Sequence, residues 1–418
     1  MSITKAVAFE QANRIGGVLE LPQGCEERLD MDQASPVFLS HVQKHEQYLG
    51  SYAQHFGLSP FIKTGRRVSS ITPILIDGEE PSVGIGPRWT VESVDLQTKS
   101  KTEEIFDAVL VCTGKYHHPY IPEISGLPEY KGTVLHSSVY RDPERYRNKV
   151  VLIIGGGPSA VDIATDLTRA AKNIILAKKQ PGLFFRNANP KVLETAMPKN
   201  FTASEVILHD GSSRHIDVVI LCTGYSFDFP FLSKECRVQT SRGRVSPLYR
   251  HLIHCEYPSM AFPFLVTLVT ITPILDCQIK FFKAVLDGKA LLPTAAEMLY
   301  CTKNDYHQRL ASIDSSPRHV AHGLPGEEGW NYMTELGTEG EFPPYEPVIR
   351  QMAQVAFAAI QSGDPDYKKA YFQRTGQDTF VYVANSDKLN RKQFEMQLLI
   401  ASQEDDALEN KLFGSLHL

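Results

Sequence analysis

The chain has 418 residues, of which 42% are hydrophobic and 22% are charged, and its formal net charge is −5. This length allows two or three domains with hydrophobic cores, and the composition is that of a globular protein. The slightly acidic balance provides no general attraction to nucleic acid or to an anionic membrane. The seven cysteines form no CxxC pair, which argues against a disulfide framework, a structural zinc site or a dithiol reductase.

Apolar runs and helical spacing give a first view of the elements in chain order. Strands are predicted at Ala6–Glu10, Phe106–Cys112 and Asp217–Cys222, and helices at Val42–His55, Cys277–Leu286, Val348–Ile360 and Lys392–Ile400. The mixed alternation of strands and helices predicts an α/β fold with parallel sheets.

The chain shows no targeting or membrane-spanning signal. Residues 1–11 lack the long apolar run of a signal peptide, and Met260–Leu275, the longest uncharged run, is short and rich in Thr and Pro. We interpret that run as buried core or as site lining, and Cys112 and Cys222 as reduced core residues. A cytoplasmic location is therefore expected, and peripheral association with internal membranes stays open.

The most informative segment reads VVLIIGGGPSAVDIATDL and begins with a predicted strand at Val150–Ile154. Gly155 allows a tight turn, and Gly157 lets a pyrophosphate approach the backbone. Pro158 and Ser159 then open a helix whose N-terminus would face the phosphates. A glycine turn without a ligand is the alternative, but the flanking strand and helix favour nucleotide binding.

The next predicted strand, Asn173–Ala177, ends where a dinucleotide fold recognises the ribose. An NAD site would have an acidic residue there, whereas this chain has Lys178 and Lys179, followed by Arg186. Cations suit the 2′-phosphate of NADP, so NADP is favoured over NAD. A solvated basic strand end is the alternative.

Two predicted strands end in nearly identical sequences, FDAVLVCTG at Thr113-Gly114 and DVVILCTG at Thr223-Gly224. A glycine after a strand lets a ligand rest on the backbone. The repeat suggests two nucleotide domains, one inserted in the other. Chance resemblance between buried strands is the alternative.

With these features in place, the chain resembles the flavin-containing monooxygenase family over roughly residues 6–336. Tyr130–Tyr140 (YKGTVLHSSVY) resembles the identifying motif FxGxxxHxxx(F/Y), with Tyr130 in place of Phe. The resemblance is also carried by GGGPSA, LCTGYSFDFPFL, FEQANRIGG and QIKFFKAVLDGKALLP.

The resemblance implies two dinucleotide-binding domains of the two-dinucleotide flavoprotein type, with the NADP domain inserted in the FAD domain. The expected divisions are residues 1–145 and 223–338 for the FAD domain, 146–222 for the NADP domain and 339–418 for a helical or irregular extension. The implied cofactor-binding residues, besides those of the glycine turn and the cations, are Glu10, Gln11, Val68, Thr113, Gly114, Thr223 and Gln278. The resemblance implies no particular catalytic residue and no metal.

The activity implied is transfer of one oxygen atom from O2, through a C4a-hydroperoxyflavin, to soft nitrogen or sulfur of a small lipophilic substrate. NADPH and FAD would be the cofactors. Two alternatives stay open: a Baeyer–Villiger-type ketone monooxygenase, and a non-catalytic NADP-binding paralogue that has lost FAD.

The chain also departs from the family pattern. The family places a strand, a GxGxxG turn and a helix before the strand at Ala6–Glu10, where only five residues stand. An incomplete gene model and a natural truncation with impaired FAD binding are both open explanations. After Phe262 the family usually continues Ile-Gly, whereas this chain has Pro263-Phe264.

Overall fold

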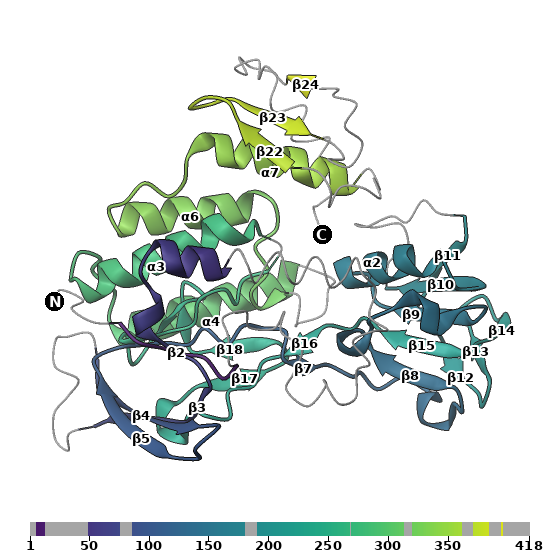
Figure 1. Ribbon diagram of the computed structural model, residues 1–418, viewed down its shortest axis with the longest axis horizontal. Coiled ribbons are helices and arrows are strands. Elements are labelled where there is room, and N and C mark those ends of the chain that lie inside the picture. Colours follow the sequence, from purple (N-terminus) through teal and green to yellow (C-terminus); the bar gives the residue numbers. More distant parts are fainter. Residues whose placement is uncertain are drawn as a thin grey trace.

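The computed structural model describes residues 6–12, 49–75, 86–179, 190–267, 269–312, 320–361, 371–383 and 394–395. These residues form two α/β units, which appear on the left and right of Figure 1 with the short strands β7 (His118–Pro119) and β16 (Tyr225–Ser226) between them. A C-terminal extension lies above the left-hand unit in that view.

A five-stranded parallel sheet is the centre of the right-hand unit. Its order is β11-β10-β9-β15-β8, and every pairing is parallel. The strands are β8 (Thr133–His136), β9 (Val150–Ile154), β10 (Asn173–Lys178), β11 (Val192–Ala196) and β15 (Val218–Leu221). The predicted strands at residues 150–154, 173–177 and 217–222 are confirmed. The domain boundary at residue 146 stays a prediction. The edge strand β8 belongs to this sheet although it precedes that boundary in the chain.

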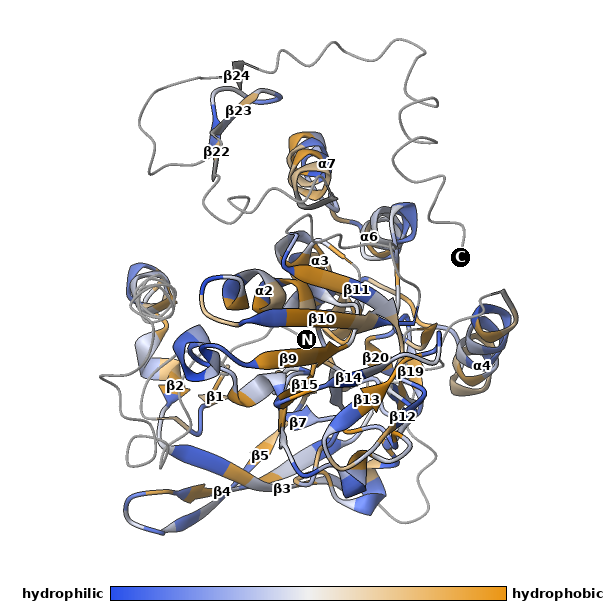
Figure 2. Ribbon diagram, turned by 90° about the vertical axis from the view of Figure 1, so that its right-hand side faces the viewer, coloured by the Kyte–Doolittle hydropathy of each residue, from blue (hydrophilic) through white to orange (hydrophobic). Residues whose placement is uncertain are grey.

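Both faces of this sheet are covered, which explains why its strands read as continuous apolar runs. On one face, Val151 and Ile153 pack with the helix α2 (Pro158–Leu167). On the other face, Leu152 and Ile154 pack with a small antiparallel sheet. That sheet contains β12 (Asn200–Phe201), β13 (Glu205–Ile207) and β14 (Ser213–His215). The apolar strands are orange in Figure 2.

The left-hand unit contains several smaller sheets. Antiparallel β3 (Arg66–Ile74), β4 (Arg88–Asp95) and β5 (Lys101–Phe106) form one, and β1 (Ala8–Phe9) pairs in parallel with β2 (Ile62–Lys63). A four-stranded sheet has the order β19-β20-β21-β6, with strands Leu248–Tyr249, Ile253–His254, Met260–Ala261 and Val109–Leu110. The hairpin of β17 (Gln239–Ser241) and β18 (Arg244–Ser246) completes the unit.

The predicted continuous strand at Phe106–Cys112 is wrong. The chain leaves β5 at Phe106 and begins β6 at Val109, because it changes partners there. Val109 and Val111 donate their N–H groups to the carbonyls of Ser259 and Ala261, both at 2.9 Å. The strand ends early, so Cys112 is exposed rather than part of the core, whereas Cys222 is buried as expected.

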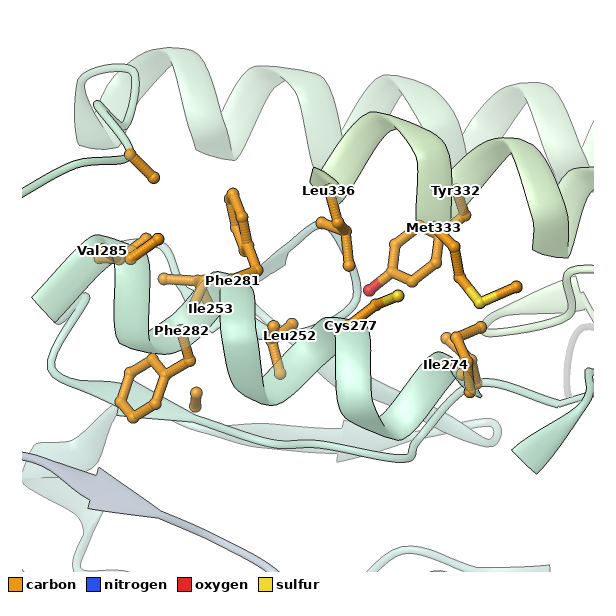
Figure 3. Packing of buried hydrophobic residues seen from close by; sticks show 14 of the residues in the cluster. Leu252, Ile253, Ile274, Cys277, Phe281, Phe282, Val285, Tyr332, Met333 and Leu336 are labelled. Carbon is orange, nitrogen blue, oxygen red and sulfur yellow. The ribbon is translucent and has the colours of Figure 1, made fainter. Parts of the chain in front are cut away.

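Helices cover the left-hand unit. These are α3 (Ile271–Leu286), which contains the predicted helix at Cys277–Leu286, α4 (Ala295–Ser312) and α6 (Glu327–Glu339). Figure 3 shows the core between α3 and α6, where Cys277 and Phe281 face Met333 and Leu336. Met260 and Phe262 are fully buried, whereas Ile271 is 56% exposed, so the interpretation of residues 260–275 as buried core or site lining agrees with burial only in the first part of the run.

The extension contains α7 (Pro347–Gln361), as predicted, and an antiparallel sheet of β22 (Tyr371–Arg374), β23 (Phe380–Val383) and β24 (Phe394–Glu395). The helix predicted at Lys392–Ile400 is wrong at its described residues, because β24 is held by pairing with β23. Of the helix predicted at Val42–His55, residues 49–55 are helical and the rest lie outside the described residues. No helix in the described ranges has the length and apolar character to cross a membrane.

A leucine comparison tests the sheet core. Leu152 on β9 is fully buried, whereas Leu193 on the edge strand β11 is 46% exposed. We expect Leu152→Ala to lower the free energy of unfolding by about 2–5 kcal/mol, because a cavity forms. Leu193→Ala should cost less than about 1 kcal/mol. Urea unfolding measures both, and equal losses would contradict the assigned burial.

Candidate functional site

The turn between β9 and α2 has the geometry of a phosphate cradle. Gly155 has φ +138°, and an added Cβ there would lie 2.2 Å from the carbonyl oxygen of Cys222. Gly157 caps α2, and nothing lies within 4 Å of a Cβ added to it. The backbone N–H groups of Gly156 and Gly157 have no backbone acceptor among the described residues. The turn is therefore open, and its donors and the helix N-terminus suit an anion.

The two lysines at the end of β10 differ in how exposed their side chains are. Lys178 is only 2% exposed, and its Nζ lies 2.8 Å from Glu194 Oε1 on β11. Lys179 is exposed at the end of the strand. Arg186 lies outside the described residues. Lys179 is therefore more accessible to a 2′-phosphate than Lys178 is. The contacts of Lys178, Lys179 and Arg186 with that phosphate stay predictions.

The Thr223-Gly224 end of β15 leads into the linker between the units. The Thr223 hydroxyl donates to the carbonyl of Tyr120, and the Tyr120 N–H donates to the carbonyl of Gly224 at 2.9 Å. These bonds continue into the antiparallel pair of β7 and β16. The hydroxyl of Thr223 therefore holds the linker, and its predicted contact with a cofactor is untested.

Contacts from the segment that resembles the identifying motif hold this linker against the sheet. The Tyr130 ring lies over Gly132, where an added Cβ would be 2.1 Å from the Tyr130 hydroxyl oxygen. His136 Nε2 lies 3.0 Å from the Gly224 carbonyl, and its Nδ1 accepts the Ser138 N–H at 3.1 Å. The Tyr140 hydroxyl donates to Asp166 on α2 at 2.7 Å. Tyr130, Gly132, His136 and Tyr140 thus each have a contact within the protein that explains why that residue type stands there.

Three of the residues predicted to hold FAD lie at the β1 and β3 strands. The Glu10 carboxylate follows β1 and accepts the Ala12 N–H at 2.9 Å, and Gln11 beside it is exposed. Val68 lies at a bulge in the pairing of β3 with β4, where the register shifts between Val68 and Ser70. The bulge leaves Ser69 without a paired residue on β4, whereas Val68 pairs with Ser93, and the backbone contact at Val68 stays a prediction.

The other residues predicted near FAD lie at the end of β6 and on α3. Thr113 is exposed, and Gly114, at φ +73°, has open space around an added Cβ. Gln278 is fully buried, with its Oε1 accepting the Phe264 N–H at 2.7 Å and its Nε2 donating to Tyr332 at 2.9 Å. Both ends of this amide are therefore bonded inside the protein.

The described part of the chain contains one glycine-rich phosphate turn, the turn before α2. Among these residues β1 pairs with β2 and β6 pairs with β21, and no pairing joins β1 to β6. The residues present thus fit NADP phosphates at α2. For FAD they provide a carboxylate after β1 and an open strand end at Gly114.

Sequence reasoning missed Lys115 and Phe264. Lys115 directly follows Gly114 and is 8% exposed, and its Nζ lies 4.2 Å from the centre of the Phe264 ring. The replacement of the family's Ile-Gly by Pro263-Phe264 was the available signal, because Phe264 has φ +61°, a conformation that favours glycine.

Comparison with known proteins identifies the class. The family model described as Flavin-binding monooxygenase-like matches residues 23–191 and 190–323. The chain belongs to this family, and the two-dinucleotide flavoprotein fold follows. Family membership supports FAD and NADP as cofactors.

Two relatives show how similar the chain is to individual members of the family. The chain is 34% identical over 285 residues to flavin-containing monooxygenase FMO GS-OX-like 9 of Arabidopsis thaliana, which covers 66% of this chain and 60% of the relative. It is 31% identical over 318 residues to FMO GS-OX-like 8 of the same plant, with coverage of 72% and 66%. Each alignment thus spans slightly less than two thirds of the relative's length.

Two solved structures share the fold. The S-allyl-L-cysteine S-oxygenase of Allium sativum matches with a TM-score of 0.68 and 30% identity, covering 78% of this chain and 72% of that one. Tmm from Pelagibacter sp. strain HTCC7211 matches with a TM-score of 0.68 and 20% identity, covering 89% and 88%.

The burial of His136 predicts a pH effect on stability. Burial lowers the pKa of His136 below its ordinary value of 6.5, so the unfolded state binds more protons as the pH falls below 6.5. Its contribution to stability is therefore present above pH 6.5 and is lost at lower pH.

We expect His136→Asn to lower the free energy of unfolding at pH 7.5 by about 1–2 kcal/mol through its lost bonds. The variant should also show a smaller loss of stability between pH 7.5 and 5.5 than the unaltered chain. Thermal unfolding at both pH values measures this, with exposed His209→Asn as the control. The same pH dependence in all three proteins would contradict the assignment.

Proposed function

We propose that the chain is a monooxygenase that uses NADPH and FAD to transfer one oxygen atom from O2 to a soft nucleophilic nitrogen or sulfur of a small lipophilic substrate. The observation that carries the proposal is the open glycine turn at α2. The close contact of Gly155 with Cys222 puts this turn next to the Thr223-Gly224 linker. Such a turn would hold NADP next to the segment that leads to the FAD unit.

In this proposal each group of residues has a separate task. Gly155, Gly157, Pro158 and Ser159 would hold the NADP phosphates, and Lys178, Lys179 and Arg186 would provide positive charge near the 2′-phosphate. Residues Glu10, Gln11, Val68, Thr113, Gly114, Thr223 and Gln278 would contact the cofactors. Bound FAD supplies the reaction with O2 once NADPH has reduced it. The other oxygen atom leaves as water, which uses one NADPH and one proton.

Sulfur is the preferred substrate atom in the proposal. The support is the S-allyl-L-cysteine S-oxygenase, which is 30% identical to this chain. A cytoplasmic location is part of the same proposal, because the free buried cysteines Cys222, Cys236, Cys255 and Cys277 suit a reducing compartment.

A second candidate is a protein that binds NADP(H) without flavin chemistry. It is favoured by the single glycine-rich phosphate turn in the described ranges and by the separate pairing of β1 and β6 there. The two candidates differ in one measurable property, which is consumption of NADPH and O2 in the presence of FAD.

The activity test incubates the purified chain with FAD and NADPH and follows flavin absorbance, O2 uptake and product. We expect a thioether to give sulfoxide at a higher rate than a tertiary amine gives N-oxide. NADPH binding without flavin absorbance or O2 uptake would favour the second candidate. Ester formation from a ketone, with no oxidation of the other two, would establish a Baeyer–Villiger enzyme instead.

A glycine pair tests the cradle. Gly157→Ala adds a methyl group into open space at φ −83°, so the free energy of unfolding should change by less than about 1 kcal/mol. Because the methyl group would occupy the phosphate position, NADPH affinity should fall about tenfold or more, about 1.4 kcal/mol. Gly50→Ala, at an exposed position where nothing lies within 4 Å of an added Cβ, serves as the control for affinity. Unchanged NADPH affinity in Gly157→Ala would refute the assigned cradle.

A further inference from the structure

Lys115 is a buried cation whose charge is not balanced by a carboxylate within the described part of the chain. It is 8% exposed, and its Nζ donates to the carbonyl of Val266 at 2.6 Å. An ammonium group has three N–H donors, and burial of a charge is unfavourable unless it is paired. A residue of this kind indicates a partner that the protein itself does not supply.

Two aromatic rings fix the position of the ammonium group. The Phe264 ring centre lies 4.2 Å from Nζ, and that of Tyr116 lies 5.6 Å away. Phe264 keeps this place at φ +61°, which is strained for a residue with a Cβ. Its N–H is fixed by Gln278, and Gln278 is fixed by Tyr332. Backbone strain held in place by buried hydrogen bonds points to a functional position.

One further cation near Lys115, Arg244, has no ion pair within the described part of the chain. His322 is 4% exposed, and its pKa lies well below the ordinary value because of burial and because His251, Arg244, Lys115 and Arg309 surround it. Arg309 is paired with Asp305 and Glu328. No described carboxylate forms an ion pair with Arg244, which stacks on Tyr306. Arg244 therefore adds to the positive charge of Lys115, whereas the neutral His322 and the paired Arg309 add little.

We propose that Lys115 binds the negatively charged, reduced form of the isoalloxazine ring of FAD at the end of β6. This inference rests on the proposed function, which puts Thr113 and Gly114 beside the flavin, directly before Lys115 in the chain. Two electrons and one proton from NADPH give the neutral oxidised ring one negative charge, and NADP⁺ is the other product. A fixed cation binds the reduced ring more tightly than the oxidised ring and so raises its midpoint potential.

The test compares Lys115→Met, Lys115→Arg and a control, Lys101→Met, which removes the same charge from an exposed strand position. Oxidised FAD is titrated by fluorescence, and the midpoint potential of bound FAD is measured with reference dyes. We expect Lys115→Met to lose about tenfold in the preference for reduced over oxidised flavin, which lowers the potential by about 30 mV for a two-electron couple. Lys115→Arg and Lys101→Met should stay close to the unaltered chain.

A measurement without cofactor shows that the variant folds and also tests the inference. Because Met removes an unpaired buried charge, cofactor-free Lys115→Met should melt at the same temperature as the unaltered chain or higher. A lower melting temperature that Lys115→Arg restores would make Lys115 a structural residue and would overturn the inference.

The other outcomes separate the two proposals. If Lys115→Met weakened the binding of oxidised and reduced FAD equally and left the potential unchanged, Lys115 would act on the cofactor phosphates instead of the ring. That result would overturn this inference and leave the proposed function in place. An unchanged potential with unchanged affinity would do the same. Failure of the unaltered chain to bind FAD, with NADPH binding intact, would overturn the proposed function and this inference together.

Discussion

The close approach of Gly155 to Cys222 is the contact on which the candidate site depends. The Gly155 N–H donates to Ala177 on β10 at 2.9 Å, and the Cys222 N–H donates to Ile154 on β9 at 2.8 Å. Three strand ends thus meet at one edge of the sheet, where ligands of open α/β sheets bind. A Cβ at residue 155 would displace the end of β15 and the linker that follows it. The nucleotide turn and the connection between the units are therefore positioned by the same few atoms.

The segment that resembles the family's identifying motif extends this constraint to the linker. His136 contacts the Gly224 carbonyl, and Tyr140 contacts Asp166 on α2. Tyr130 donates to the Ile216 carbonyl just before β15. None of these contacts needs a proton to move during a reaction. These contacts give the motif a structural role, which is to hold one unit at a fixed position relative to the linker.

The parts of the fold that the sequence predicted well are those fixed by local pattern. Strand β9, the turn and α2 follow directly from an apolar run buried on both faces and from the glycines after it. The errors come from partners distant in the chain. The segment at 106–112 divides because Val109 and Val111 pair with residues 259–261. The contact of Lys178 with Glu194 on β11 likewise could not be read from the sequence, and the predicted role of Lys178 at a 2′-phosphate stays a prediction. Sequence spacing cannot tell whether a cation faces a ligand or a carboxylate of its own chain.

The predicted binding residues differ in how much hydrogen-bonding capacity they have left for a ligand. The amide of Gln278, the hydroxyl of Thr223 and the ammonium of Lys178 are all bonded to other parts of the protein. The N–H groups of Gly156 and Gly157 have no backbone acceptor among the described residues. Lys115 has one hydrogen-bond acceptor there for three donors, and Phe264 adopts a strained backbone beside it. Because unmet polar groups cost stability, those that persist where a cofactor is expected are the best candidates for contact with it.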